Sequence, residues 1–128
     1  MKLLLDTHTF IWWRDTPENL SARAYEAISS TESDIYLSVV AVWEIQIKRA
    51  IGKIEVKGSL HDAIRAERDA NGFRILSVEL AHSLNIENLP PIHGDPFDRI
   101  LIAQAMVEEM TVVTVDPKFT EYGVKVLW

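Results

Sequence analysis

Apolar residues along this chain alternate between short continuous runs, typical of buried strands, and stretches with the spacing of helices. The run at residues 2–5 stops at Asp6, as a buried parallel strand does at its carboxyl end. The predicted strands are residues 2–5, 35–38, 73–76, 111–115 and, at an edge, 124–127. The predicted helices are a segment through Phe10 to Trp13, then residues 20–30, 39–50, 60–70 and 78–84, and a last one that opens at Asp95-Pro96.

Polar residues and glycines mark the ends of several of these helices. Ser59, Ser77 and Asp95 are candidate N-caps, because their side-chain oxygens can accept hydrogen bonds from the free backbone N–H groups of a first turn. Gly52 and Gly72 follow predicted helices at the place where a left-handed residue commonly ends one.

Strands that alternate with helices at this spacing predict an α/β sandwich with a mostly parallel sheet of about four to five strands. Connections between parallel strands place helices on both faces of the sheet. No repeat and no linker interrupts the pattern, so we expect residues 1–128 to form a single domain. In such sheets the functional site lies beyond the carboxyl ends of the strands.

The composition excludes several classes of protein. Of the 128 residues, 48% are hydrophobic and 25% charged, which is typical of an ordinary globular domain. The absence of cysteine excludes a disulfide framework, a thiolate zinc site and a thiol nucleophile. The longest fully apolar run, residues 39–43, is too short for a membrane helix, and residues 3–5 are too few for a secretory signal. We therefore expect a cytoplasmic protein with no membrane partner.

Four acidic residues fall where the site is expected. Asp6 directly follows the first predicted strand, and Asp116 directly follows the fourth. Glu44 lies in the first half of the helix after the second strand, and Asp98 lies in the first turn of the helix that Asp95 begins. These carboxylates would point toward one end of the sheet.

Carboxylates gathered in this way repel one another and raise one another's pKa unless a cation compensates. Oxygen ligands without His or Cys suit Mg²⁺, with Mn²⁺ as a substitute. The chemistry implied is metal-assisted phosphodiester hydrolysis, in which the metal makes a bound water more acidic and stabilises charge on the phosphate. One ion or two ions would both fit these residues.

Each acid also has a structural explanation. Asp6 could cap the helix that follows it, and Asp98 could stabilise its own helix through the dipole. Asp116-Pro117 is a common turn opening. Glu44 stands in an almost wholly apolar segment and could pair with Lys48 one turn later. The shared location of the four acids is what favours the functional interpretation.

Several motifs, in this order, make the whole chain resemble a known family. The motifs are Leu3-Leu4-Leu5-Asp6-Thr7-His8, Ser38 with Trp43-Glu44, His93-Gly94-Asp95-Pro96-Phe97-Asp98-Arg99 with the helix that follows, and Thr114-Val115-Asp116. The chain resembles the PIN-domain ribonucleases, specifically the VapC-type toxins of type II toxin–antitoxin pairs. No single motif is specific, but the ordered set spans nearly all of the sequence.

The resemblance implies a PIN-like three-layer α/β/α fold and an Mg²⁺- or Mn²⁺-dependent endoribonuclease. Asp6, Glu44 and Asp98 fall on the three main acidic positions of the family, and Asp116 falls on a more variable fourth. The family also implies a homodimer and a small cognate antitoxin protein. What the resemblance does not specify is the RNA target.

Other residues near the expected site have candidate roles. Thr7 or Thr114 could hydrogen-bond a ligating carboxylate. Arg99 could contact the scissile phosphate, or form an ion pair that tempers the acids. His8 and His93 are close to the site, and we expect a solvent-facing or structural role for each because the carboxylates suffice for a metal.

Tryptophans and basic residues complete the set of candidates. Trp12, Trp13 and Trp43 are expected in the core, but Trp12 and Trp13 would point about 100° apart on a helix, so one could be exposed as an anchor for a dimer or antitoxin. The densest basic stretch could guide RNA backbone or form a solvated helix end. It consists of Lys48, Arg49, Lys53 and Lys57.

The net charge of −6 argues against broad electrostatic binding of nucleic acid and favours a cationic partner. If the four candidate acids are set aside, 13 basic residues remain against 15 acidic ones, so RNA is not excluded as a substrate. The same acidity predicts an antitoxin tail that presents basic residues to the acidic pocket.

The sequence also bears on two other function classes. A haloacid-dehalogenase-like phosphatase needs a second Asp two residues after the first, where this chain has His8, and the paired acids of a receiver domain are not evident. The remaining alternative is a PIN-fold module that is catalytically weak and acts mainly by binding a partner protein or RNA.

Overall fold

The computed structural model describes residues 1–128 and contains one five-stranded sheet in which every neighbouring pair is parallel. The strand order is β3-β2-β1-β4-β5. The strands are β1 (Lys2–Leu5), β2 (Asp34–Ser38), β3 (Arg74–Leu76), β4 (Thr111–Val113) and β5 (Val126–Leu127). The predicted parallel sheet, including its short edge strand near the carboxyl terminus, is confirmed.

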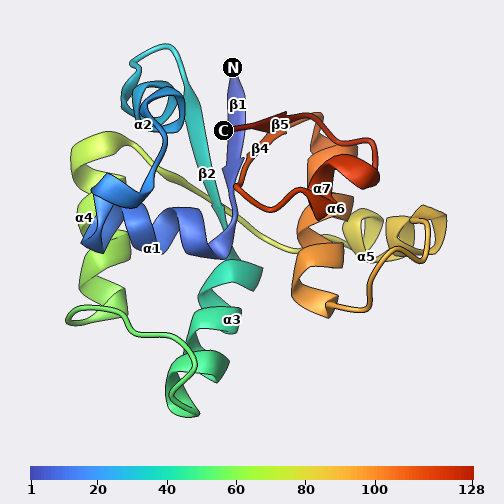
Figure 1. Ribbon diagram of the computed structural model, residues 1–128, viewed down its shortest axis with the longest axis horizontal. Helices are drawn as coiled ribbons and strands as arrows, with labels where there is room; N and C mark the ends of the chain where they lie inside the picture. The colour runs from blue at the N-terminus through green and yellow to red at the C-terminus, as the bar shows by residue number, and fades with distance from the viewer.

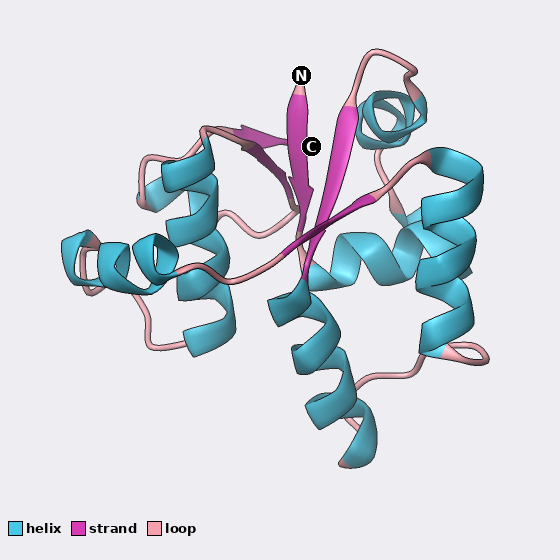
Figure 2. Ribbon diagram, turned by 180° about the vertical axis from the view of Figure 1, so that it is seen from behind, coloured by secondary structure: helices cyan, strands magenta, loops and turns pink.

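Helices cover both faces of this sheet. They are α1 (Thr7–Asp15), α2 (Ala22–Ser29), α3 (Val39–Ala50), α4 (Leu60–Asn71), α5 (Leu80–Asn85), α6 (Pro96–Glu108) and α7 (Lys118–Glu121), with 3₁₀ turns at Pro17–Asn19 and Ile86–Asn88. α1, α2 and α4 lie to one side of the strands, while α5, α6 and α7 lie to the other; α3 extends from the end of β2 (Figure 1). The view from behind shows the same division (Figure 2). The three-layer α/β/α fold is thus confirmed.

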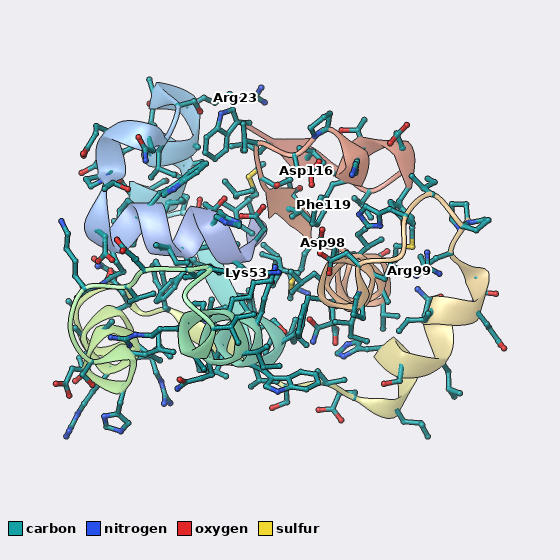
Figure 3. The ribbon with its side chains drawn as sticks, turned by 60° about the horizontal axis from the view of Figure 1, so that its bottom comes forward. Arg23, Lys53, Asp98, Arg99, Asp116 and Phe119 are labelled. Carbon is teal, nitrogen blue, oxygen red and sulfur yellow. The ribbon has the colours of Figure 1, made fainter.

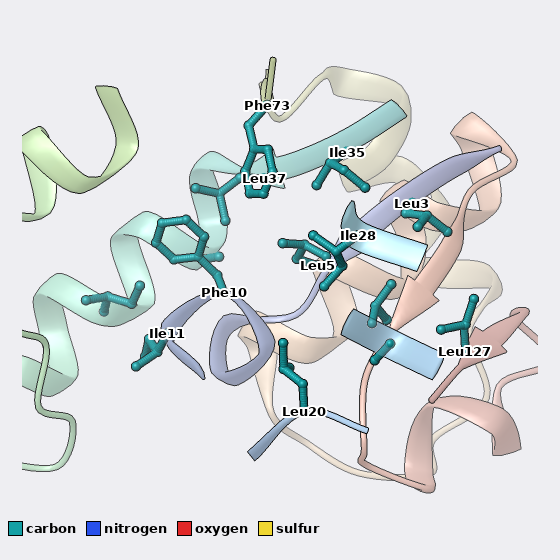
Figure 4. Packing of buried hydrophobic residues seen from close by; sticks show 14 of the residues in the cluster. Leu3, Leu5, Phe10, Ile11, Leu20, Ile28, Ile35, Leu37, Phe73 and Leu127 are labelled. Atoms are coloured by element: carbon teal, nitrogen blue, oxygen red, sulfur yellow. The ribbon is translucent and has the colours of Figure 1, made fainter. Parts of the chain in front are cut away.

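Alternating side chains of β1 divide the core into two parts. Leu3 and Leu5 face the side of α1 and α2, where they pack with Phe10 and Ile28 (Figure 4). Leu4 faces the opposite side and belongs to the cluster beneath α6 and α7. All three leucines have no exposed surface, and full burial of a side chain this size contributes roughly 2 kcal/mol each. The central strand therefore holds both helical layers.

Side-chain hydrogen bonds fix the helices that follow the strands. Thr9 Oγ1 donates to the carbonyl of Val113 at 2.8 Å, which ties α1 to the end of β4. Ser38 caps α3 by accepting from the backbone N–H of Val40 at 3.1 Å. The predicted cap Ser59 accepts from the N–H of Asp62 in α4. The first two contacts set the first turns of α1 and α3 at the edge of the sheet where β1 and β2 end, and the third fixes the start of α4 after the loop that follows α3.

Several predicted boundaries were wrong: α2 and β5 each begin two residues later than predicted, and two further differences concern α5 and β4. Ser77 does not cap α5, which begins two residues later than predicted: Glu79 is the N-cap, and its backbone N–H donates to Nδ1 of His82 at 2.9 Å. β4 stops at Val113 rather than continuing through Val115, because the side chain of Thr114 bonds to Asp6 and the chain then turns outward. The short helix α7 was not predicted.

Glycines end both helices at which they were predicted to do so. Gly52 follows α3 with φ of +73°, and its backbone N–H donates to the carbonyl of Arg49 at 3.1 Å. Gly72 follows α4 with φ of +66°, a left-handed conformation in which a residue with a side chain would be strained.

None of the helices combines the length and apolarity needed to cross a membrane.

Candidate functional site

The sheet reverses its direction of winding between β1 and β4, which are neighbours in space but not in sequence. From β1 the chain enters α1 on one face, and it returns to β4 through α6 on the other face (Figure 1). In parallel sheets such a switch opens a crevice at the carboxyl ends of the strands. A cavity of about 700 Å³ lies at this place.

Acidic side chains dominate the polar lining of the cavity. All four predicted acids line it, together with the cap residue of α6; they are Asp6, Glu44, Asp95, Asp98 and Asp116. Lys48, Lys118, His8 and His93 also line it. The structure thus brings together carboxylates from four segments that are far apart in the sequence.

Asp6 caps a helix and also lines the cavity. Its Oδ1 accepts from the backbone N–H of Thr9 at 2.8 Å, which caps α1, and its Oδ2 accepts from Thr114 Oγ1 at 2.5 Å. Burial raises the pKa of Asp6, although the hydrogen bonds from Thr114 and Thr9 and the nearby His8 act in the opposite direction. The cap holds this buried carboxylate at the base of the crevice.

Glu44 is buried in α3 and has partners for both carboxylate oxygens. Thr7 Oγ1 donates to Oε1 at 2.5 Å, and Lys48 Nζ pairs with Oε2 at 2.5 Å. Burial lowers the pKa of Lys48, but its bond to Glu44 and the charges of Glu44, Asp95 and Asp98 outweigh this, so the pKa lies above its ordinary value. The ion pair considered in the sequence analysis therefore exists and lies inside the acidic cavity.

Asp98 has a strongly raised pKa. Burial, followed by the charges of Asp95, Glu44, Asp6 and Asp116, raises its pKa from 3.8 to about 7. Asp95 caps α6 through Oδ1, which accepts from the N–H groups of Phe97 and Asp98 at 2.9 and 3.2 Å. Burial and the negative charges of carboxylates on other elements thus both disfavour ionisation of Asp98.

Asp116 reaches the cavity from the loop after β4, and Figure 3 shows it above Asp98 of α6. Its backbone N–H donates to Thr114 Oγ1 at 3.0 Å, and its Oδ1 accepts from the N–H of Lys118 at 2.9 Å. Thr114 therefore orders both Asp6 and the loop that carries Asp116. The turn predicted for Asp116-Pro117 coexists with its place in the cavity.

Arg99 does not lie in the cavity and forms no ion pair with the acids. Its Nη1 donates to the carbonyl of Pro90 at 3.0 Å and to the hydroxyl of Tyr122 at 3.3 Å. Consecutive helical residues point about 100° apart, so Arg99 emerges on another flank of α6 than Asp98 (Figure 3). The ion pair predicted as one role for Arg99 is therefore absent, and the side chain holds the segment that leads into α6.

His93 and Tyr122 form a contact that the sequence did not reveal. Nδ1 of His93 lies 3.0 Å from the Tyr122 hydroxyl, and Nε2 lies 3.5 Å from Oδ2 of Asp98 without a hydrogen-bond partner. His93 thus forms part of the cavity wall and faces an acid. No local pattern signals this pair, because 29 residues separate its members.

The cavity lining includes no group of three or more His, Asp or Glu side chains already arranged to hold one metal ion. Instead, Oδ2 of Asp6 accepts a hydrogen bond from Thr114. Oε1 of Glu44 accepts one from Thr7, and its Oε2 forms the ion pair with Lys48. Mg²⁺ is commonly bound by only one or two carboxylates and several waters, and all acidic donors here are oxygen atoms. The donor set therefore fits a hard divalent cation.

We expect Asp98→Asn to stabilise the metal-free protein at pH 8 and to do so less at pH 5. Because the folded-state pKa of Asp98 is raised to about 7, the folded protein keeps a proton that the unfolded chain loses, so stability falls as pH rises from about 4 to 7. Asparagine does not ionise, so the variant does not lose this stability as the pH rises. Melting in EDTA should show a gain of roughly 3–5 °C at pH 8.

The exposed Asp62, in α4, gives the matched control Asp62→Asn, which should show no such pH-dependent gain. A melting temperature for Asp98→Asn at or below that of the wild type at pH 8 would contradict the repulsion described above.

Comparison with known proteins places this geometry in context. The PIN domain family profile matches residues 3–125. No curated protein matches the sequence. Among solved structures, VapBC2 from Rickettsia felis, bound to a DNA fragment from their promoter, is similar with a TM-score of 0.74 at 14% identity, covering 99% of this chain and 98% of that chain.

Two further structures share the fold. DNA-bound VapBC from Salmonella typhimurium has a TM-score of 0.65 at 16% identity, covering 99% of this chain and 97% of that chain. FitAcB from Neisseria gonorrhoeae has a TM-score of 0.62 at 22% identity, covering 98% and 96%. At these identities the similarity establishes the fold alone. The family profile spans nearly the whole chain, and the protein is therefore a member of the PIN domain family.

Proposed function

We propose that this chain is an Mg²⁺- or Mn²⁺-dependent endoribonuclease and the toxin of a type II toxin–antitoxin pair. The observation that carries the proposal is the convergence of Asp6, Glu44, Asp98 and Asp116 on one cavity at the carboxyl ends of the sheet. Membership of the PIN domain family and the shared fold with VapBC and FitAcB complexes support it. The proposal includes action in the cytoplasm.

These four carboxylates are the proposed metal ligands. A divalent ion bound there would supply positive charge to stabilise negative charge on the phosphate and would favour water as the nucleophile. In the net reaction water adds to phosphorus, a P–O ester bond breaks, and the departing oxygen takes up a proton. Thr7 and Thr114 orient Glu44 and Asp6 through their hydrogen bonds.

Positive side chains at the cavity suit an anionic substrate. Lys118 is exposed at the start of α7, next to Asp116, and could contact an RNA phosphate. Lys48 neutralises Glu44, so the cavity is less negative than its number of acids suggests. Arg99 is bound to Pro90 and Tyr122 and has no part in this proposal.

The negative charge of the cavity also indicates which side chains an antitoxin would present to it. A cavity with five acids and few cations would accept a basic side chain from a bound protein as well as a metal ion. We therefore expect the antitoxin tail to present basic residues to it. An antitoxin segment that is acidic at this cavity would overturn the inference.

One observation favours the alternative of a catalytically weak binding module. Glu44 is already paired with Lys48, and the carboxylates are not arranged around a common metal position. The two proposals differ in whether purified protein cleaves RNA in a divalent-dependent manner.

We expect the wild type to cleave RNA with Mg²⁺ or Mn²⁺ and to stop when EDTA is added. Asp6→Asn and Asp98→Asn should each lose roughly 100-fold or more of this activity, because each removes a negative oxygen from the cavity. Asparagine at position 6 can still cap α1, which protects the fold. The measurement is the initial rate of cleavage, with RNA ends mapped by sequencing.

Asp62→Asn is the control for a lost acid outside the cavity and should cleave at the wild-type rate. Divalent-dependent cleavage that persists in both cavity variants would refute the site. A wild type that neither cleaves RNA nor binds Mn²⁺ would support the non-catalytic alternative.

The proposal includes a homodimer, and exposed apolar side chains offer a surface for it. Trp43 is 61% exposed, against the expectation that it lies in the core, and packs edge-on against Phe97 at 5.4 Å. Around them an apolar groove of about 570 Å³ separates α3 from α6. Val39 and Val78 line this groove, and further exposed apolar residues are Ile47 on α3, Ile51 directly after it, and Leu80 and Leu84 on α5.

A second copy of the chain is the occupant that suits this surface. The lining of the groove contains no charged residue, whereas RNA or a basic tail would need complementary charge. A self-complementary apolar patch is what a twofold dimer requires. The acidic cavity lies beside it, since Trp43 precedes Glu44 and Phe97 precedes Asp98.

We expect the wild type to sediment as a dimer and Trp43→Glu to sediment as a monomer, because a charge at the centre of an apolar interface would be desolvated. Val107→Glu, at the other end of α6, is the control and should leave the dimer intact. A dimer that survives Trp43→Glu at micromolar concentration would place the interface elsewhere.

A further inference from the structure

Two aromatic side chains of α1 border the acidic cavity. His8 and Trp12 are one helical turn apart and therefore lie on the same face of the helix. Their ring centroids are 6.0 Å apart, with an angle of 55° between the planes. His8 is exposed and Trp12 is partly exposed, and both line the cavity that contains Asp6 and Asp116.

Trp12 also packs against a second aromatic ring. Trp128, at the end of the chain, packs edge-on against it with centroids 5.9 Å apart. The neighbouring Trp13 turns the other way, packs against Tyr25 and donates its indole N–H to Glu67 at 2.7 Å. Of the two neighbouring tryptophans only Trp12 therefore lines the acidic cavity.

Trp12 also borders a second cavity, of about 560 Å³, which contains basic side chains. Arg49 and Lys57 line this second cavity together with Glu55 and with Asp15, the last residue of α1, whose carboxylate accepts the backbone N–H of Lys57 at 2.9 Å. Trp12 is the one residue that lines both cavities. The side chain thus stands at the junction of the two cavities.

We propose that His8 and Trp12 form a stacking platform for an unpaired RNA base next to the phosphate that is cleaved. The inference rests on the proposed ribonuclease function and adds to it the side chains that contact a base beside the cleaved bond. A base in a duplex is already stacked on both faces, whereas a base in a single strand or loop can stack on an aromatic ring. Stacking also accepts all four bases, so the platform selects unpaired RNA rather than a sequence.

The first test is kinetic and uses a short RNA that carries a cleavage site mapped for the wild type. Trp12→Ala should raise KM about 10-fold and leave kcat within about threefold, since stacking supports binding and the acids are untouched. Trp12→Phe should stay near the wild type because it keeps an aromatic face. His8→Ala, at an exposed position, should raise KM less.

Tyr25→Ala is the matched control, since Tyr25 is an exposed aromatic residue on α2 that lines neither cavity. It should leave KM unchanged. Thermal melting of every variant separates loss of binding from loss of folding, and the conservative Trp12→Phe variant keeps the test valid if Trp12→Ala melts early.

The second test removes the base instead of the side chain. One abasic nucleotide is moved along the RNA, and the position beside the cleaved phosphate should raise the KM of the wild type by a similar factor. In Trp12→Ala the same abasic nucleotide should have almost no further effect, because the two changes remove one contact. The same RNA annealed to its complement should be a poor substrate.

The outcomes separate the inference from the function on which it rests. Wild-type cleavage with an unchanged KM in Trp12→Ala, or equal cleavage of duplex and single strand, would overturn the stacking platform alone. Absence of both divalent-dependent cleavage and RNA binding in the wild type would overturn the ribonuclease and the platform together.

Discussion

Repulsion among buried carboxylates is the constraint on which this structure depends. Five acids line one cavity, and several are held there by ordinary structural contacts: Asp6 and Asp95 cap helices, and Asp116 begins the turn into α7. The fold therefore cannot form without bringing the charges together. Burial and, after it, repulsion from the other acids raise the pKa of Asp98, and a bound cation would offset the repulsion.

The rest of the molecule tolerates this repulsion because its stability comes from elsewhere. Leu3, Leu4 and Leu5 anchor apolar clusters on both faces of the sheet, away from the cavity. Lys48 and the hydroxyls of Thr7 and Thr114 give the innermost carboxylates partners. A site that lowers stability in the absence of its ligand is a common compromise between folding and function.

Features with a local cause were predictable from the sequence, and features that depend on distant contacts were not. The caps Ser59 and Asp95 and the end of α4 at Gly72 follow from neighbouring residues alone. The convergence of the acids followed from the rule for parallel sheets. The early end of β4, the His93–Tyr122 contact and the place of Arg99 depend on tertiary contacts that no local pattern contains.

The central claim is that this acidic cavity binds a divalent cation, and titration calorimetry with Mn²⁺ tests it most directly. We expect saturable binding of one or two ions per chain in the wild type and in Asp62→Asn, and binding weakened at least about 10-fold in Asp6→Asn and Asp98→Asn. Absence of saturable binding in the wild type, or equal affinity in all four proteins, would contradict the account.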